Sequence, residues 1–204
     1  KKTFDAVHID TVSLCVYSDL FDGLPIALNH HNFESAMLES RSRTERNLIK
    51  SLYYRYEASR LLKSEVKHCR QSHLNVTCSD DDAEAMKAAI GDGKFLSVPN
   101  GVDVSYFYQN RSITVEEKSI VIVGGLSWYP NREAVEYFIR EIWPLIKARI
   151  PGMTVDIIGR GPTQEMLKLA ESDKSFRVHG FVEDVRDYFW RAQFYLCPIR
   201  TGGG

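Results

Sequence analysis

Glycine-rich turns follow three of the short apolar runs in the second half of the chain, and two arginines lie among them. Glycine lets the backbone approach a phosphate group closely, and the N–H groups at the start of a following helix favour an anion. An arginine adds a permanent positive charge that suits a diphosphate. The pattern therefore predicts a phosphate-binding site, although each glycine by itself could also serve a tight turn. The residues concerned are Gly124, Gly125, Gly159, Arg160, Gly161, Arg200, Gly202, Gly203 and Gly204.

A histidine follows the second apolar run of the first half. His31 can donate or accept a hydrogen bond near neutral pH, which suits a position beside a reacting group. The alternative is a polar loop residue with no chemical role. Glu34 belongs either to the same site or to the first turn of a helix, where a carboxylate interacts favourably with the helix dipole.

Residues 41–70 form a basic amphipathic pattern, with nine Lys and Arg against three Glu. Their apolar residues recur at three- and four-residue steps, which is the spacing of a helix. A basic helix of this kind can rest on anionic lipid. The alternative is an apolar stripe that faces the core beneath a solvated basic face. The apolar residues are Leu48, Ile49, Leu52, Tyr53, Tyr56, Leu61, Leu62, Val66 and Cys69.

Short apolar runs alternate with amphipathic stretches in both halves, which predicts strands separated by helices and hence an α/β fold with parallel sheets. Pro144 lies inside one expected helix, so we expect a kink near Trp143. In the first half we expect strands over 4–9, 25–29, 74–78 and 95–98, and helices over 41–70 and 80–90, the second capped by Ser79. In the second half we expect strands over 119–123, 153–158, 176–179 and 194–197, and helices over 133–149, 163–171 and 184–191.

The alternation stops between residues 99 and 118, where turn residues precede a polar stretch. We therefore expect two Rossmann-like domains, one over 1–99 and one over 119–204, joined by a linker over 100–118. The chain ends directly after an apolar run, where a parallel sheet normally continues into a covering helix. We accordingly expect both domains to be incomplete and the chain to be a fragment.

Composition narrows the class of protein. The chain is 44% hydrophobic and 26% charged, as soluble globular domains are, and its net charge of −1 gives no general attraction to nucleic acid. No apolar run approaches the roughly 20 residues of a membrane-spanning helix, and the first residues lack the apolar core of a signal peptide. The four cysteines are scattered, which argues against a zinc site or a disulfide framework. We expect a cytoplasmic protein with no nucleic-acid partner, able to lie at the inner face of a membrane through residues 41–70.

An ordered series of short motifs runs along the chain. It comprises Val98-Pro-Asn-Gly-Val-Asp103 with Phe107, Gly124-Gly-Leu126, Ile157-Ile-Gly-Arg-Gly-Pro162, Val178-His-Gly-Phe-Val-Glu-Asp184 and Cys197-Pro-Ile-Arg-Thr-Gly-Gly-Gly204. In this order the motifs resemble the retaining glycosyltransferases of family 4, which have the GT-B fold. Trp128-Tyr-Pro-Asn131 and Glu141-Ile-Trp-Pro144, with His31-Asn-Phe-Glu34, Glu57 and Glu65, resemble a branch that contains bacterial sugar transferases of exopolysaccharide assembly.

The resemblance implies a cleft between two Rossmann-like domains, in which a sugar moves with retention from a nucleotide sugar to a saccharide or a lipid-linked acceptor, in surface polysaccharide synthesis. It implies no metal and no other cofactor, because backbone N–H groups and cationic side chains stabilise the departing diphosphate. His31 would face the transferred sugar, with Asn32 and Glu34 on the acceptor side. The resemblance places Gly124, Gly125, Gly159, Arg160 and Gly161 along the nucleotide, Phe181 and Val182 near the base, and Arg200 with Gly202, Gly203 and Gly204 near the phosphates.

The sequence departs from the family pattern in two respects. Gly125 and Pro130-Asn131 stand where many members have an arginine and a lysine that contact the diphosphate. The paired glutamates that follow the last glycine-rich loop in the family are absent, so we expect this polypeptide to be inactive by itself. Two other functions stay open: a nucleotide-sugar epimerase of GT-B fold, and a non-catalytic nucleotide- or sugar-binding module.

Overall fold

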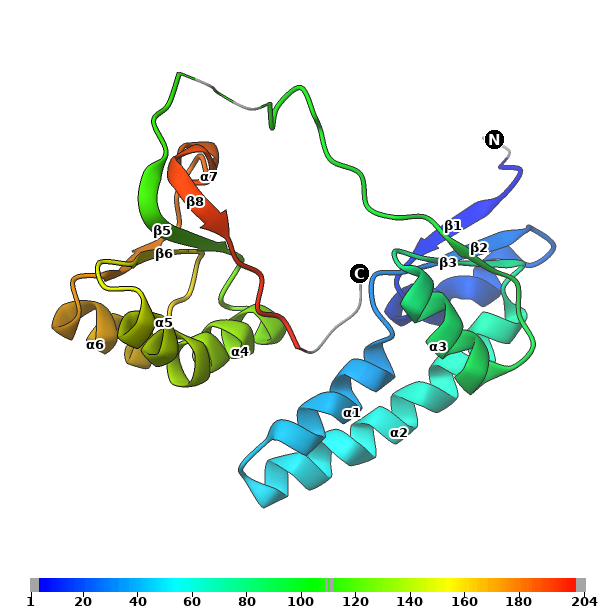
Figure 1. Cartoon of the computed structure of the whole chain (residues 1–204). Coiled ribbons are helices and arrows are strands. Elements are labelled where there is room, and N and C mark those ends of the chain that lie inside the picture. The colour runs from blue at the N-terminus through cyan, green and yellow to red at the C-terminus, as the bar shows by residue number, and fades with distance from the viewer. Residues whose placement is uncertain (1–3, 109, 111, 201–204) are drawn as a thin grey trace. The chain divides into compact units, whose positions relative to one another are not determined.

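The computed structural model describes residues 4–108, 110 and 112–200, which divide into two compact units, residues 4–101 and 102–200 (Figure 1). Each unit contains one four-stranded parallel sheet with helices packed against it. The predicted α/β fold of two Rossmann-like parts is confirmed. Within the described ranges, no helix has the length and apolar character needed to cross a membrane.

The first unit is built on a sheet of strand order β1-β2-β3-β4. Its register pairs Asp10 with Asn29 and His30 with Thr77, so the carboxyl ends of the strands share one edge. All four strands were predicted, with small differences at their ends. They are β1 (Val7–Asp10), β2 (Ile26–His30), β3 (Leu74–Thr77) and β4 (Phe95–Ser97).

The helices of the first unit differ from the prediction in two places. The expected single helix over 41–70 is wrong, because the chain forms a hairpin of two helices, α1 (Glu34–Thr44) and α2 (Leu48–Gln71). Asn47 separates them, since its side chain accepts hydrogen bonds from the N–H groups of Ile49 and Lys50 and so starts a new helix. A 3₁₀ segment, η1 (Val12–Phe21), was not predicted, whereas α3 (Asp80–Ile90) has the predicted bounds and its Ser79 cap.

The apolar stripe of α2 is only partly a core stripe. Toward the end of the helix, Leu61, Leu62, Val66 and Cys69 belong to the core of the first unit. In the first two and a half turns, by contrast, most of the apolar side chains are exposed. These are Leu48, Ile49, Leu52, Tyr53 and Tyr56. The helical period was predicted correctly, but the interpretation of the whole stripe as core is wrong for its first half.

The second unit has a sheet of strand order β7-β6-β5-β8. Its core lies between the sheet and α4, α5 and α6, which cover one face, while α7 lies on the other (Figure 1). The strands are β5 (Glu116–Val123), β6 (Thr154–Ile158), β7 (Phe176–Gly180) and β8 (Ala192–Tyr195), of which β8 begins and ends two residues before the prediction.

The long helix expected over 133–149 consists of three segments. A π-helical turn, η2 (Phe138–Ile142), interrupts it directly before Pro144, which has no N–H group to donate to the preceding turn. The interruption occurs where a kink was predicted. The helices of this unit are α4 (Tyr129–Tyr137), α5 (Trp143–Arg149), α6 (Gln164–Ser172) and α7 (Arg186–Arg191).

Candidate functional site

The glycine-rich turns of the second unit meet at the carboxyl ends of β5, β6 and β7. The N–H of Gly124 donates to the carbonyl of Ile158 at 3.0 Å, and the N–H of Gly159 donates to the carbonyl of Gly180 at 2.8 Å. Ser127, in the turn that leads to α4, donates to the carbonyl of Arg160 at 3.0 Å. Three strand ends are therefore held together by backbone hydrogen bonds, as at the ligand-binding edge of a doubly wound sheet.

The glycines on this edge are required for different reasons. A Cβ atom on Gly159 would lie 1.8 Å from the carbonyl oxygen of Gly124, so no other residue fits there. Gly161 has a φ of +84°, which favours glycine. A Cβ on Gly125, in contrast, would meet no atom within 4 Å. Packing thus explains Gly159 and backbone conformation explains Gly161, whereas the space beside Gly125 is open.

A cation and an aromatic ring lie together on the same edge. The Arg160 guanidinium carbon is 4.8 Å from the centre of the Phe181 ring, and both side chains are exposed. Val182 is half-buried next to them. An exposed arginine stacked on an aromatic side chain offers a positive charge and a flat apolar face, the two features that bind a nucleotide.

Arg200 lies against α4. Its guanidinium pairs with the Glu133 carboxylate and is 3.9 Å from the centre of the Tyr137 ring. For Arg200 to contact a phosphate, as expected from the sequence, it would have to leave Glu133. Gly202, Gly203 and Gly204 lie outside the described residues.

The corresponding edge of the first unit joins β1 and β2. The Nε2 atom of His31 is 2.9 Å from Asp10 Oδ1, and the Asn29 side chain donates to the same oxygen at 2.8 Å. The Asn29 hydrogen bond, followed by that of His31, lowers the pKa of Asp10. A neutral imidazole that donates from Nε2 keeps Nδ1 as an acceptor, so Asp10 fixes the tautomer of His31. The His31 side chain is 55% exposed and can meet a substrate.

The backbone beside Asp10 is strained. Thr11 has a φ of +92°, a conformation that residues with a Cβ rarely adopt. The Thr11 N–H donates to the carbonyl of Asn29 at 3.0 Å, which holds the turn after β1 in place. Backbone strain of this kind is often found at functional sites. Here the strained residue directly follows Asp10, which pairs with His31.

A buried carboxyl group underlies the His31 turn. Glu65 of α2 has no exposed surface, and its Oε1 atom accepts a hydrogen bond from the Ser35 N–H at 3.3 Å, in the first turn of α1. Among the described residues its Oε2 atom has no hydrogen-bond partner. Burial raises the pKa of Glu65 to about 7, and burial also raises the pKa of the half-buried Glu34. Asn32, between His31 and α1, is half-buried.

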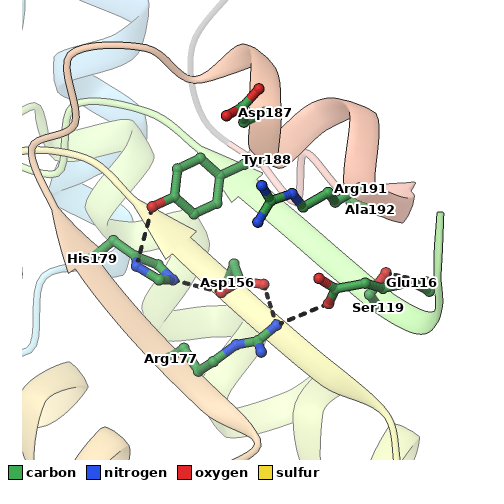
Figure 2. A pocket seen from close by; sticks show the side chains of 9 residues that line it. All are labelled: Glu116, Ser119, Asp156, Arg177, His179, Asp187, Tyr188, Arg191 and Ala192. Carbon is green, nitrogen blue, oxygen red and sulfur yellow. Dashed lines mark hydrogen bonds and ion pairs between the residues drawn. The ribbon is translucent and has the colours of Figure 1, made fainter. Parts of the chain in front are cut away.

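A second group of charged side chains, which was not predicted, lines a pocket of about 270 Å³ on the α7 side of the second sheet (Figure 2). Asp156 accepts from Arg177 at 2.5 Å and pairs with His179 Nε2 at 2.6 Å, and the Tyr188 hydroxyl lies 3.5 Å from His179 Nδ1. Glu116 adds a carboxylate 3.8 Å from Arg177. These charges largely satisfy one another, so the cluster stabilises the sheet face. The sequence did contain a signal for this cluster, because Arg177 and His179 alternate with apolar residues in β7 and Asp156 interrupts the apolar run of β6.

Across the described ranges, no group of three or more His, Cys, Asp and Glu side chains could hold a metal ion. The edge of the second unit thus offers backbone N–H groups and an arginine beside an aromatic ring, and the edge of the first unit, taken by itself, offers a histidine oriented by a carboxylate. We expect chemistry that depends on binding and stabilising a negatively charged group.

Comparison with known proteins agrees with this geometry. Residues 117–204, of which 117–200 lie in the second unit, match the family model described as glycosyl transferases group 1. The fold of the chain matches solved GT-B glycosyltransferases. No curated protein sequence matches the chain.

Two solved structures illustrate the similarity. The pneumococcal O-GlcNAc transferase GtfA, in complex with UDP and GlcNAc, is similar with a TM-score of 0.58 at 15% identity, over 88% of this chain and 34% of that one. TarM is similar with a TM-score of 0.62 at 8% identity, over 94% of this chain and 36% of that one; a TarM mutant from S. aureus also matches. The chain thus spans about a third of the length of these structures.

Proposed function

We propose that the protein transfers a sugar from a nucleotide-sugar donor to a saccharide or lipid-linked acceptor, with retention, in the cytoplasmic synthesis of a surface polysaccharide. The observation that carries the proposal is the glycine-rich edge of β5, β6 and β7. It lies within the residues that match the glycosyl transferases group 1 model. It also combines close backbone packing at Gly159 with open space at Gly125.

On this edge the diphosphate of the donor lies beside Gly125, whose backbone it can approach without obstruction. Arg160 supplies the cation, and Phe181, stacked on it, supplies an apolar face for the base, with Val182 alongside. Arg200 joins the phosphates by leaving Glu133. Backbone N–H groups and arginines then stabilise the leaving diphosphate, and the reaction proceeds without a metal or another cofactor.

On the edge of the first unit, His31 takes the sugar-facing role and Asn32 and Glu34 contact the acceptor. Asp10 holds the His31 ring by a hydrogen bond at 2.9 Å, which leaves Nδ1 to accept a hydrogen bond from a sugar hydroxyl. An oriented side chain loses less entropy when substrate binds, so the pair favours a single substrate geometry.

Isothermal titration of the chain with UDP and with GDP, in EDTA, tests the donor site. We expect one of the two to bind, and Arg160→Ala to weaken binding about tenfold or more because a charge-assisted contact is lost. Arg149→Ala, which removes an exposed arginine at the end of α5, is the matched control and should change little. Absence of binding at millimolar nucleotide, or equal losses in both variants, would contradict the proposed site.

The reaction itself is tested on the protein encoded by the complete gene. Incubation with nucleotide sugars and saccharide acceptors should give a product whose anomeric configuration, read by NMR, equals that of the donor. An inverted product would refute retention, an epimerised donor would indicate an epimerase, and nucleotide binding without any turnover would indicate a binding module.

A further inference from the structure

The start of α2 presents an apolar surface to solvent. Five large side chains of its first two and a half turns are between 59% and 80% exposed. They lie at i, i+1, i+4, i+5 and i+8, so they form one continuous stripe along the helix. We call this stripe the tip patch; it consists of Leu48, Ile49, Leu52, Tyr53 and Tyr56.

The tip patch is not needed to hold the hairpin together. The opposite side of α2 packs on α1, where the Ser51 hydroxyl donates to the Ser42 carbonyl at 2.6 Å and Arg41 stacks on Tyr54 at 4.2 Å. Within the first unit, the connection between α1 and α2 projects beyond the sheet (Figure 1). The tip patch therefore occupies the outer side of a projecting hairpin.

Positive charge continues along the same face. Arg60, Lys63 and Lys67 follow Tyr56 at steps of four, seven and eleven residues, which places them in line with the stripe. Of the two acids of α2, Glu57 pairs with Arg60 at 3.0 Å and offsets that charge, whereas Glu65 is buried, so the positive charge of the face rests on Lys63 and Lys67. The face is thus apolar at the projecting end and basic toward the body of the unit.

We propose that this face of the α1–α2 hairpin binds an anionic lipid bilayer. Leu48, Ile49 and Leu52 enter the boundary between headgroups and acyl chains, and the two tyrosines lie at headgroup level, where an amphipathic ring is stable. Lys63 and Lys67 meet the lipid phosphates. The charge of the face matches anionic headgroups, and an apolar stripe continued by cations is the composition of helices that lie at membrane interfaces.

Flotation of the purified chain with vesicles tests the proposal, independently of sugar transfer. We expect binding to phosphatidylcholine vesicles with about 30% phosphatidylglycerol and much weaker binding to pure phosphatidylcholine, because each cation near an anionic surface contributes about fivefold to partitioning. High salt should reduce binding to the anionic vesicles.

Two variants and two matched controls locate the contact. The double variant Leu48→Ser and Ile49→Ser should lower partitioning at least tenfold, and Lys63→Gln with Lys67→Gln should lower it about twentyfold or more. Leu20→Ser removes an equally exposed leucine of η1 and Lys87→Gln an exposed lysine of α3, and neither should change binding. Circular dichroism confirms that each variant is folded.

Three results would overturn the proposal. The chain could fail to float with anionic vesicles, or the controls could lose as much binding as the tip variants. The chain could also form a dimer in light scattering that the leucine and isoleucine changes dissociate, without any lipid dependence. That result would make the tip patch an interface between copies.

Discussion

Replacing Glu65 of α2 with glutamine removes a buried ionisable group that contacts the first turn of α1, and it keeps the shape of the side chain. Burial raises the pKa of Glu65 from 4.5 to about 7, so its folded environment disfavours the charged form. Below pH 4.5, the pKa of the group in the unfolded chain, the carboxyl is protonated in the folded and the unfolded chain alike, so its burial causes no pH-dependent loss of stability. As the pH rises from 4.5 to about 7, the carboxyl ionises in the unfolded chain but stays protonated in the folded chain, so the wild type loses stability relative to the variant. Above about pH 7 the group ionises in both states and the loss no longer grows.

The expected size of this loss follows from the two pKa values. At about 1.4 kcal/mol for each pH unit, the rise from 4.5 to about 7 corresponds to about 3 kcal/mol. Glu65→Gln should therefore gain about 3 kcal/mol over wild type between about pH 4.5 and pH 8. The substitution also changes the hydrogen bond to Ser35, which alters the free energy of unfolding by the same amount at every pH. This contribution cancels when the effects at pH 4.5 and pH 8 are subtracted.

Urea unfolding at both pH values measures the effect. All three tryptophans lie between residues 128 and 190, so tryptophan fluorescence follows the second unit while circular dichroism follows both. The second unit should be unaffected and serves as an internal reference. Glu57→Gln, which removes a partly exposed carboxylate from the same helix, is the matched control. An effect of Glu65→Gln that is equal at the two pH values would refute the reasoning.

Four further changes test the two edges. Gly159→Ala should destabilise the second unit by at least about 2 kcal/mol in fluorescence-monitored unfolding, because the added Cβ would overlap the carbonyl oxygen of Gly124. Gly125→Ala should change the free energy of unfolding by no more than about 0.5 kcal/mol, but it should weaken nucleotide binding. His31→Ala should leave unfolding unchanged, since the side chain is exposed, and lower kcat of the complete enzyme at least tenfold; unchanged turnover would exclude the proposed role. Glu133→Gln releases Arg200 and should tighten nucleoside diphosphate binding a few-fold at low salt; weaker binding in titration would show that the pair instead shapes the site.

Local sequence signals determined much of the fold. The helix Asp80–Ile90 was predicted at both ends because Ser79 caps it, acids occupy its first turn, and Gly91 ends it with a φ of +79°. Strands of the second unit were predicted because β-branched runs precede glycine-rich turns. The same glycines located the edge that gathers Gly124, Gly159 and Arg160, since strand ends in a parallel sheet share one side.

The start of α1 was only partly predicted from neighbouring residues. Glu34, which was given as a first-turn carboxylate in one of two alternatives, does begin the helix, but the N-cap residue, Phe33, has no side chain that could accept a hydrogen bond, so the local sequence carries no capping signal. The Ser35 N–H instead bonds to Glu65, which is thirty residues away along the chain. The pairing of His31 with Asp10 depends on the register between β1 and β2 in the same way.

By itself the sequence determined the alternation of strands and helices, the glycine-rich turns and the residues that could bind an anion, because propensity, capping and turn preference act between neighbours in the chain. Tertiary structure decided which side of α2 is covered, which carboxyl group is buried, and that Asp156 joins Arg177 and His179. Burial and pairing of charges depend on which elements pack together, and the period of a pattern does not carry that information.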